Sequence, residues 1–381
     1  MRIIIAVTSS LSYRLIEGQI NFLTSNGYEV HFCSSYCETT KRQVELEGGV
    51  FHPVNLEREI SFLKDIKSII KVVKLIKTIK PDIINCSTPK AGLIYCISSL
   101  FYGQVKTIFT LRGLRSDTLR GLKYRIVKFT EYLSCKIADK VIVVSPSLKN
   151  HSIAKGILIK EKAIVIGEGS SNGINLKRFT RTSEIEIAAQ KIRKENGLND
   201  SNVVIGYVGR LVSDKGIKEL YHAFCYLRKS YSNIRLLLIG SFESGDELDK
   251  DLIHEMKTNP DVIILNYMEN IEIAFPAMDC FVLYSYREGF GNVSIEAAAM
   301  ELPVVVADIP GLKDTIIHNK TGLLAKARDE NELYNVLLKM VGNANFRKLL
   351  GENGRDRVVK YFQREFIWTE QLEIYKKIIE K

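Results

Sequence analysis

The stretch that decides the fold spans residues 287–306 and reads REGFGNVSIEAAAMELPVVV. It follows an apolar run that should be a strand ending at about Tyr284. It then passes through a loop punctuated by Gly289 and Gly291 and changes to the alanine-rich pattern of a helix that should open at residues 291–292. A helix that starts directly after a strand presents backbone N–H groups and a partial positive charge, which suit a phosphate. The glycines also let a ligand approach the backbone closely.

Two acidic residues frame this loop and helix. Glu288 precedes the helix start, and Glu296 lies eight positions later, a turn or more into the helix. Carboxylates at both ends of a phosphate-binding turn suit an elongated nucleotide-sugar, because one can accept from sugar hydroxyls and the other from ribose hydroxyls. The alternative is a capped helix after a glycine turn, with both glutamates on an ordinary helix surface.

A second strand-to-helix turn carries two cations. Residues 208–216 read VGRLVSDKG and follow another β-type run. The guanidinium of Arg210 can donate two hydrogen bonds to phosphate oxygens, and the ammonium group of Lys215 adds a single positive charge. Together they would neutralise a leaving nucleoside diphosphate as its bond to the sugar breaks. The alternative is a solvated loop with two ordinary cations.

Short β-type runs alternate with longer helical runs along the whole chain, which is typical of parallel sheets covered by helices. Strands are expected at 3–8, 28–33, 82–86, 105–111, 141–144, 163–166, 203–208, 234–239, 262–265, 280–283, 304–307 and 322–325, and helices at 13–26, 62–80 and 184–196. We therefore predict an α/β protein with two Rossmann-like domains, 1–180 and 181–361, and a C-terminal helix, 362–381, that could pack back on the first domain. Since parallel sheets bind ligands at the carboxyl ends of their strands, the two sheets are expected to face a central cleft.

The composition is that of a globular protein, but the charge is uneven. Hydrophobic residues make up 46% and charged residues 26%, which excludes a disordered or collagen-like chain. The net charge is +10. Residues 1–180 hold 27 Lys/Arg against 14 Asp/Glu, whereas residues 181–381 hold 27 against 30. The excess positive charge therefore belongs to the first half, and an anionic partner is expected there.

The cysteines and the N-terminus favour a cytoplasmic protein. The seven cysteines are scattered, form no C-x-x-C and show no zinc-ligand spacing, so reduced thiols are expected. The first residues do not resemble a signal peptide, and the longest weakly polar stretch, 91–103, is too short to span a bilayer. Peripheral contact with the cytoplasmic face of the plasma membrane remains compatible with this prediction.

Together these segments resemble a known family. The E-x₇-E spacing of Glu288 and Glu296, the turn GRLVSDKG and two successive α/β domains resemble the retaining nucleotide-sugar glycosyltransferases of the GT-B fold, in particular glycosyltransferase family 4. The segments PDII (81–84), TPKAG (88–92), VSPS (144–147) and SNGIN (171–175) are similar to the branch that builds bacterial capsule, O-antigen and related surface polysaccharides. The resemblance covers essentially the whole chain.

The resemblance implies an enzyme of the hexosyltransferase class. It would move a hexose or N-acetylhexosamine, with retention, from a nucleotide-sugar to a glycan acceptor. The donor is expected to be a UDP-sugar and the acceptor to be linked to polyprenyl pyrophosphate.

The family pattern also assigns the donor contacts residue by residue. Arg210 and Lys215 would bind the pyrophosphate, and Glu296 the ribose hydroxyls. Glu288 would be the catalytic carboxylate on the donor sugar. It has been proposed as a nucleophile in the family, whereas a front-face route needs no enzyme nucleophile. The backbone cradle is expected at Phe290, Gly291, Asn292 and Val293, with the base held near residues 266–270.

The sequence departs from the family at one catalytic position. Residues 109–115 read FTLRGLR, so Arg112 stands where many relatives carry a histidine near the donor sugar and the acceptor. Arginine cannot act as a general base, which leaves the proton acceptor open. Arg112 could instead clamp a phosphate of the donor or of a pyrophosphate-linked acceptor. The alternative is an exposed loop arginine.

No cofactor and no metal ion are expected. The first βα turn, residues 8–12, lacks the G-x-G-x-x-G pattern of dinucleotide-binding proteins. Residues 249–251 read DKD, but they lie in an acidic stretch of helical character, so a solvated helix is the expected structure. The resemblance implies an enzyme that acts without a bound metal, with the nucleotide-sugar as a substrate.

A basic stripe suggests where an anionic partner could lie. Five lysines recur every three or four positions and should share one helix face: Lys64, Lys67, Lys71, Lys74 and Lys77. The opposite, core-facing stripe is expected to be Ile66, Ile69, Ile70, Val73 and Ile76. Residues 112–128 form a second basic concentration. These cations could rest on an anionic membrane that carries the acceptor, or they could be solvated helix faces.

Two other functions compete with sugar transfer. A GT-B sugar-nucleotide epimerase would use the same domain pair without an acceptor. A non-enzymatic nucleic-acid-binding protein would explain the positive charge, but not the two glutamates around a phosphate-ready helix start, and no zinc finger or aromatic strand motif is present. Nucleic acid is therefore not expected as a partner.

Overall fold

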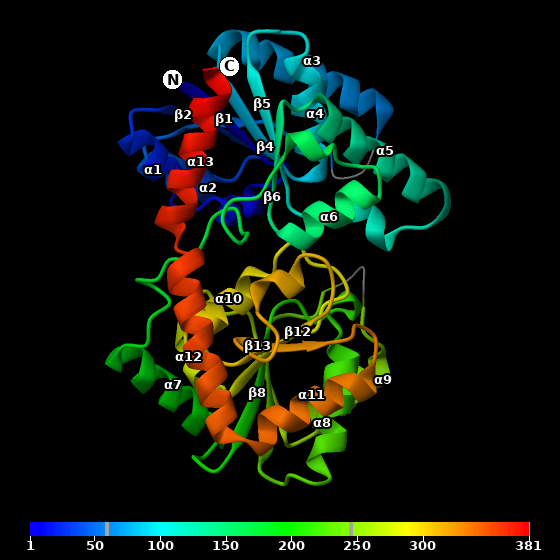
Figure 1. Cartoon of the computed structure of the whole chain (residues 1–381), viewed down its shortest axis with the longest axis vertical. Coiled ribbons are helices and arrows are strands. Elements are labelled where there is room, and N and C mark those ends of the chain that lie inside the picture. The colour runs from blue at the N-terminus through cyan, green and yellow to red at the C-terminus, as the bar shows by residue number, and fades with distance from the viewer. Residues whose placement is uncertain (58–60, 244–246, 381) are drawn as a thin grey trace. The chain divides into compact units, whose positions relative to one another are not determined.

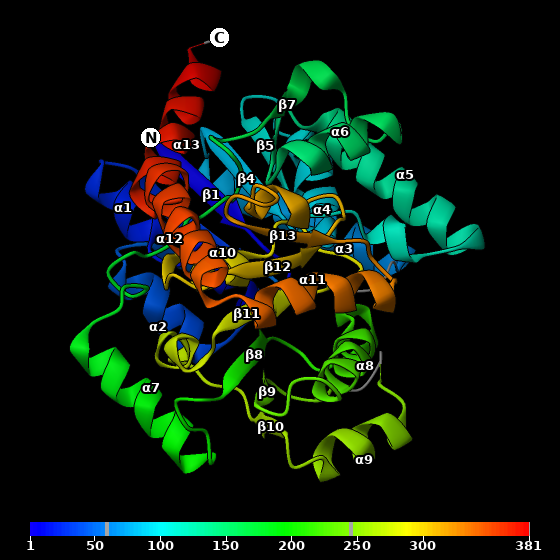
Figure 2. The same ribbon diagram turned by 60° about the horizontal axis from the view of Figure 1, so that its bottom comes forward.

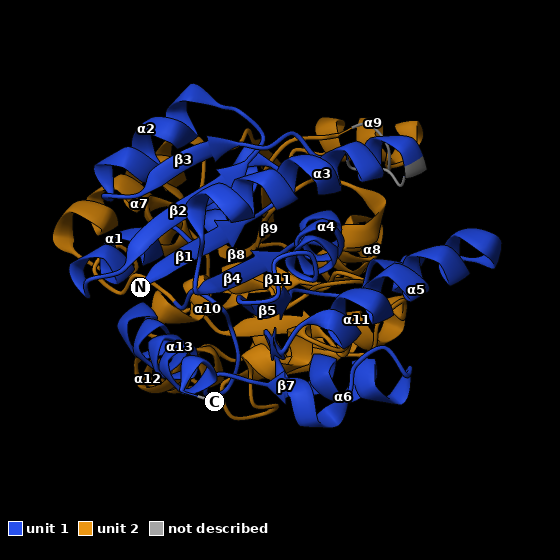
Figure 3. Cartoon of the chain, turned by 90° about the horizontal axis from the view of Figure 1, so that it is seen from above, with its two compact units in different colours: residues 1–173, 364–381 blue, residues 174–363 orange. Residues whose placement is uncertain are grey.

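The computed structural model of the chain describes residues 1–57, 61–243 and 247–380 (Figure 1). It divides into two compact units, residues 1–173 with 364–381 and residues 174–363, as Figure 3 shows. The boundary lies at Gly173 rather than at residue 180. The last helix was expected from residue 362 as a segment that could pack back on the first domain; it begins at Arg364 and does belong to the first unit.

The first unit contains one sheet whose described strands are all parallel, in the order β3-β2-β1-β4-β5-β6-β7. The strands are β1 (Arg2–Ala6), β2 (Glu29–Ser34), β3 (Val50–Pro53), β4 (Ile83–Ser87), β5 (Lys106–Leu111), β6 (Lys140–Val143) and β7 (Ala163–Ile164). Strand β3 was not among the predicted strands, because its short, half-exposed sequence lacks a continuous apolar run.

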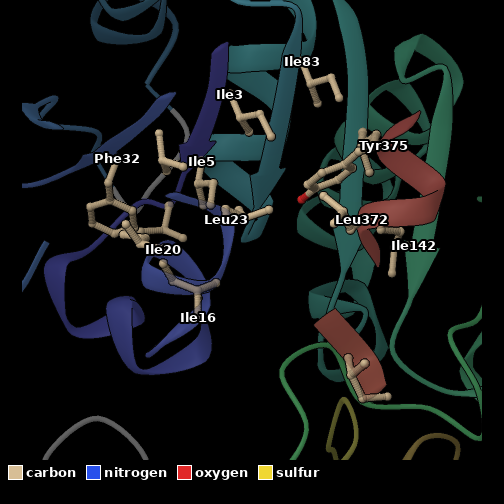
Figure 4. Close-up of a cluster of buried hydrophobic side chains, with 14 of the residues drawn as sticks. Ile3, Ile5, Ile16, Ile20, Leu23, Phe32, Ile83, Ile142, Leu372 and Tyr375 are labelled. Atoms are coloured by element: carbon tan, nitrogen blue, oxygen red, sulfur yellow. The ribbon is translucent and has the colours of Figure 1, made fainter. Parts of the chain in front are cut away.

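Helices cover both faces of this sheet. They are α1 (Gln19–Ser25), α2 (Glu38–Leu46), α3 (Phe62–Ile79), α4 (Pro89–Ser99), α5 (Gly121–Ile137), α6 (Pro146–Ala154) and α13 (Arg364–Ile379). Helix α4 lies between α3 and α5 and packs against both (Figure 1). On the other face, α1 and α13 pack together over the hydrophobic cluster drawn in Figure 4.

Polar contacts as well as apolar ones hold α13 to the first unit. Leu372 and Tyr375 join the core beside strand residues such as Ile5 (Figure 4). The Tyr375 hydroxyl accepts from Nδ2 of Asn85 on β4 at 2.6 Å and from Nε2 of Gln371 at 2.7 Å. These contacts explain why the end of the chain returns to a sheet formed by its beginning.

One helix predicted in the first unit is divided in two by a turn. The helix expected at 13–26 is a 3₁₀ turn, Ser10–Leu15, followed by α1. The break falls at Gly18, which has φ +80° and where a Cβ would lie 2.9 Å from the Trp368 ring.

Among the described apolar side chains of α3, Val72, Ile76 and Ile79 are buried, whereas Ile66 and Ile70 are exposed. The five predicted lysines are exposed. The lysine stripe was therefore assigned correctly, and the apolar stripe was rotated by part of a turn.

The second unit also contains a sheet whose described strands are all parallel, in the order β10-β9-β8-β11-β12-β13. Its strands are β8 (Val203–Val208), β9 (Ile234–Ile239), β10 (Val262–Leu265), β11 (Cys280–Leu283), β12 (Val304–Ala307) and β13 (Gly322–Ala325), as predicted. Its helices are α7 (Ser183–Glu195), α8 (Ile217–Arg228), α9 (Lys250–Thr258), α10 (Asn292–Ala299), α11 (Glu330–Gly342) and α12 (Ala344–Tyr361). Helix α10 packs against α12, and α8 against α11 (Figure 2).

Candidate active site

The predicted donor residues gather where the order of the second sheet reverses. From β8 the chain proceeds outward to β9 and β10, then returns to β11 on the other side of β8. At such a point the loops after the two neighbouring strands diverge, and ligands bind outside the carboxyl ends. Arg210 and Lys215 lie in the loop after β8, and Glu288 lies in the loop after β11. The topology therefore brings together Lys215 and Glu288, which are 73 positions apart in the sequence.

Backbone contacts fasten these two loops to each other. The Tyr286 N–H donates to the Asp214 carbonyl at 2.8 Å. Gly216 has φ +64°, and a Cβ there would lie 2.3 Å from the carbonyl oxygen of Tyr284. A glycine is thus required by both conformation and space, and it permits the close approach of the two loops.

Lys215 and Glu288 form a direct ion pair at this junction. Lys215 Nζ lies 2.5 Å from Oε1 of Glu288, and the two side chains are 13% and 21% exposed. The Ser285 hydroxyl donates to the same carboxylate oxygen at 3.1 Å. The pair is partly shielded from water, so its attraction is screened less than that of a surface pair. An incoming phosphate would compete with Glu288 for the lysine.

Arg210 extends from the same loop into a more open environment. Its side chain is 49% exposed and contacts Glu243 at 3.3 Å and Asp214 at 3.9 Å. The Tyr207 hydroxyl donates to the Arg210 carbonyl at 2.8 Å, which fixes the backbone while the guanidinium keeps access to solvent. The two predicted cations thus occupy one loop but different surroundings.

Helix α10 begins where the sequence predicted. Its N-cap is Gly291, which has φ +77° and no side chain to cap the helix. A Cβ at this position would lie 2.6 Å from Leu312. Phe290 is buried and packs its ring against Phe362 at 5.4 Å, so only its backbone can face a ligand. Asn292 and Val293 form the half-exposed first turn of the helix.

Glu296 occupies the second turn of α10 and is half-buried between the buried residues Ile295 and Ala297. The predicted separation of the two glutamates by a helix start is confirmed. Their roles toward a donor stay predictions.

A residue that sequence reasoning missed lies behind Glu288. Gly311, in the loop after β12, has φ +92°. A Cβ there would lie 2.3 Å from the Gly289 carbonyl oxygen and 2.7 Å from that of Glu288. The loop after β12 thus supports the backbone that carries the predicted catalytic carboxylate. The sequence feature that could have indicated this role is the Pro310-Gly311 pair, which follows β12.

The other predicted segments of the second unit are placed as follows. Residues 266–270 follow β10 at the edge of the sheet, and the Gly240 N–H donates to the carbonyl of Leu265 just before them at 2.9 Å. Asp249 is the N-cap of α9, and its carboxylate accepts from the N–H groups of Asp251 and Leu252. Among the described residues no group of three or more His, Cys, Asp or Glu could hold a metal ion.

In the first unit, Arg112 follows β5 and is not the exposed loop arginine of the alternative interpretation. Its guanidinium donates to the Ser171 hydroxyl and, at 3.3 Å, to the Leu15 carbonyl. Its Nε is buried without a hydrogen-bond partner among the residues described. Burial lowers the pKa of Arg112 to about 10, which leaves it protonated at neutral pH.

The reversal point of the first sheet lies between β1 and β4. Thr8 and Thr88 follow these strands, and their hydroxyl oxygens are 2.7 Å apart. Thr88 has φ +75°, which is unusual for a β-branched residue and is typical of sites where the fold imposes a conformation.

Comparisons with known proteins agree with the family resemblance. The family model described as Glycosyltransferase Family 4 matches residues 14–178, and that described as Glycosyl transferases group 1 matches residues 188–357. The capsular polysaccharide biosynthesis glycosyltransferase CapM of Staphylococcus aureus is 35% identical over 98% of this chain and 97% of its own length.

Two further similarities are more distant. The UDP-Gal:alpha-D-GlcNAc-diphosphoundecaprenol alpha-1,3-galactosyltransferase of Escherichia coli is 26% identical over 82% of this chain and 79% of its own length. The crystal structure of Anabaena Alr3699/HepE in complex with UDP has a TM-score of 0.81 at 20% identity, covering 99% of this chain and 100% of that one.

Proposed function

The chain belongs to glycosyltransferase family 4 and has the GT-B fold, and from this premise we propose that it is a retaining enzyme of bacterial surface polysaccharide synthesis. It transfers a hexose or N-acetylhexosamine from a UDP-sugar to a glycan linked to polyprenyl pyrophosphate. The observation that carries the proposal is the contact between Lys215 and Glu288 at the carboxyl ends of β8 and β11, beside the start of α10.

The names of the relatives support the donor and the acceptor. CapM is described as a capsular polysaccharide enzyme, and the E. coli relative uses UDP-Gal and a diphosphoundecaprenol-linked sugar. The Anabaena structure holds UDP. A UDP-sugar and a lipid-linked acceptor are therefore the first pair to test.

In the proposed donor complex the cations of the β8 loop take the diphosphate. Arg210 and Lys215 bind its oxygens, and the backbone of residues 290–293 cradles phosphate and sugar. Lys215 then exchanges part of its contact with Glu288 for the phosphate, which leaves the carboxylate to accept from donor-sugar hydroxyls. Glu296 accepts from the ribose hydroxyls, and residues 266–270 hold the base.

The chemical step follows a front-face route. The bond between the anomeric carbon and the diphosphate oxygen breaks while the acceptor oxygen bonds to the same face of that carbon. The acceptor proton passes to the leaving phosphate oxygen, so no enzyme base is needed where Arg112 stands. The cations stabilise the negative charge that develops on the diphosphate. We propose that this step requires no bound metal.

Arg112 is proposed to bind a phosphate, of the donor or of the pyrophosphate-linked acceptor. Its two terminal nitrogens already donate to oxygen atoms, and its buried Nε is available as a further donor. A charged, partly dehydrated guanidinium suits this role and does not suit general base catalysis.

The enzyme is proposed to work in the cytoplasm, at the surface of the plasma membrane. The described residues contain no helix long and apolar enough to cross a membrane. The surplus of 27 basic over 14 acidic residues before residue 181 supports a peripheral contact with anionic lipids through the first unit.

A donor panel tests the proposal. Purified enzyme is incubated with UDP-, GDP- and ADP-sugars, with and without a polyprenyl-pyrophosphate-linked acceptor, and nucleoside diphosphate release is measured. Release should require the acceptor and should be abolished in Lys215→Ala and Glu288→Ala. The exposed Lys348→Ala in α12 is the matched control. An isomerised UDP-sugar without transfer would replace this proposal with an epimerase, and full release by both site variants would refute the site.

A further inference from the structure

Helix α5 carries an uncovered row of large apolar side chains. Leu122, Ile126 and Phe129 are 73%, 41% and 60% exposed. Their spacing of four and three residues places them on one helix face. The buried face of the same helix contains Val127, Glu131, Ser134 and Cys135. The row is therefore not part of the core, and no described segment covers it.

The first half of α3 shows a similar surface. Leu63, Ile66 and Ile70 are exposed, again with spacings of three and four residues. They alternate with the exposed cations Lys64, Lys67 and Lys71. Two helices of the same unit thus combine exposed apolar side chains with lysines.

Neither helix has an acidic residue of its own on its exposed face, although Glu57, just before α3, is exposed and pairs with Lys64 at 2.9 Å. The acidic residue of α3 is Asp65, which is buried and accepts from Lys90 Nζ at 2.7 Å. The acidic residue of α5 is Glu131, which is buried and accepts from the N–H and hydroxyl groups of Ser116. On α5 the apolar row is flanked by the exposed cations Lys123 and Arg125. Each helix therefore presents cations and apolar groups outward and keeps its acid inward.

The two surfaces lie toward one edge of the sheet. Helices α3, α4 and α5 pack side by side on one face, with α4 in the middle (Figure 1). In a parallel α/β sheet each crossover helix begins at the edge where strands end. The apolar residues lie in the N-terminal halves of both helices, toward the edge that carries Thr88 and Arg112.

We propose that this surface, Leu63, Ile66 and Ile70 of α3 with Leu122, Ile126 and Phe129 of α5, inserts into the interfacial region of an anionic lipid bilayer. The apolar side chains enter the boundary between headgroups and acyl chains, while the neighbouring lysines and arginines meet anionic headgroups. This rests on the proposed function only in that a lipid-linked acceptor would then meet the enzyme beside Arg112.

The charged side chains of this surface favour an anionic bilayer over two other partners, a second copy of the chain and a nucleic acid. A second copy of the chain would bring like charges together across the same helices, with no exposed carboxylate of α3 or α5 to compensate them. A nucleic acid would satisfy the cations but leave the apolar rows in water. An anionic bilayer satisfies both kinds of side chain.

Vesicle flotation tests the insertion. Wild-type protein is mixed with phosphatidylglycerol/phosphatidylcholine vesicles and with phosphatidylcholine vesicles, at 50 and 500 mM NaCl (about 14 and 4 Å Debye length). Binding should require the anionic lipid, and a fraction should persist at high salt because insertion is not screened. The triple variant L122Q/I126Q/F129Q should bind at least tenfold less at both salt concentrations. Leu46→Gln on α2, also highly exposed, is the matched control.

Fluorescence gives a second, independent measurement. The chain has one tryptophan, Trp368, which is buried and supplies a constant background. In Phe129→Trp, vesicles with brominated acyl chains should quench the added emission but not that of wild type. Loss of all binding at high salt, or equal binding by the triple variant, would overturn insertion. A dimer that the triple variant dissociates would assign the surface to a second copy.

These measurements are independent of sugar transfer. The triple variant should retain turnover with a water-soluble acceptor analogue, because no substituted residue lies in the proposed donor site. Failure of transfer by wild type with every donor would refute the proposed function while leaving vesicle binding intact.

Discussion

The ammonium group of Lys215 lies 2.5 Å from the carboxylate of Glu288, and this contact joins the loop after β8 to the loop after β11. Both residues lie at the reversal point of the second sheet, where ligands of such sheets bind. Since the lysine has a carboxylate partner in this structure, its side chain is held in place before any ligand binds. The contact holds the two loops together. Single substitutions of Lys215 and of Glu288 should show that the two residues have different roles.

Lys215→Ala and Glu288→Gln should impair catalysis in different ways. Without Lys215 the diphosphate loses a cation, so UDP affinity and kcat should both fall, the latter about 10²–10³-fold. Glu288→Gln should lower kcat similarly but keep UDP affinity within about threefold, since the lysine becomes free for phosphate. Calorimetric titration with UDP and steady-state kinetics measure the two effects. Equal loss of UDP affinity in both variants would contradict the division of roles.

Gly311→Ala should lower kcat by displacing the backbone that carries Glu288. The new Cβ would lie 2.3 Å from the Gly289 carbonyl, and the positive φ of 92° adds strain, so the backbone of Glu288 must shift. Gly197→Ala is the matched control, because it has φ +67° with nothing within 4 Å. The control should lose about 1 kcal/mol of stability and no activity. If the two variants have the same kcat, Gly311 does not position the carboxylate.

The sequence predicted the second unit more closely than the first, for physical reasons. Strands β8 to β13 are continuous apolar runs of a doubly covered sheet, so their bounds were correct. Strand β3 is a half-exposed edge strand and left no such signal. In α3 the isoleucines outnumber the buried positions, and periodicity alone could not show which of them face solvent. Gly311 was missed because its role depends on a neighbour more than 20 residues away that only the sheet brings near.

Tyr375→Phe should destabilise the first unit. The hydroxyl is buried and accepts from Asn85 and Gln371, so its removal leaves two buried amide groups short of a partner. A loss of about 1–3 kcal/mol in the free energy of unfolding is expected. Urea unfolding followed by Trp368 fluorescence measures it, because the tryptophan belongs to the same unit. An unchanged midpoint would show that the hydroxyl network adds no stability.

The histidine pair on β2 and β3 should make the first unit less stable in mild acid. His31 Nδ1 lies 2.9 Å from His52 Nε2, and burial, with a smaller contribution from His31, lowers the pKa of His52 below its usual value of about 6.5. Its neutral form is thus favoured in the folded state. This stability is present above about pH 6.5 and is lost as the pH falls through the lowered pKa.

His52→Asn should reduce the change in unfolding midpoint between pH 7.5 and 5.5 relative to wild type. Trp368 fluorescence again reports the first unit, and the comparison cancels the titration of other groups. The same pH dependence in both proteins would show that His52 does not contribute to it.

Arg112 should act on phosphate rather than as a base. Its guanidinium is fixed by Ser171 and the Leu15 carbonyl and stays protonated, with a pKa of about 10. Arg112→Lys keeps the charge but loses the planar fork, so turnover should fall about tenfold or more, and Arg112→Ala should fall further. Arg112→His should not restore activity, because a histidine that is neutral at pH 7.5 lacks the charge that the phosphate needs.

The substrate whose KM rises when Arg112 is substituted identifies the phosphate group that Arg112 contacts. A rise in KM for the UDP-sugar alone would place Arg112 on the donor, and a rise for the lipid-linked acceptor alone would place it on the acceptor pyrophosphate. An acid limb that appears in the pH–rate profile only in Arg112→His would instead show that a base can act at this position. Unchanged kinetics with both substrates in Arg112→Ala would remove the residue from the active site, since a guanidinium that binds a phosphate cannot be deleted without cost.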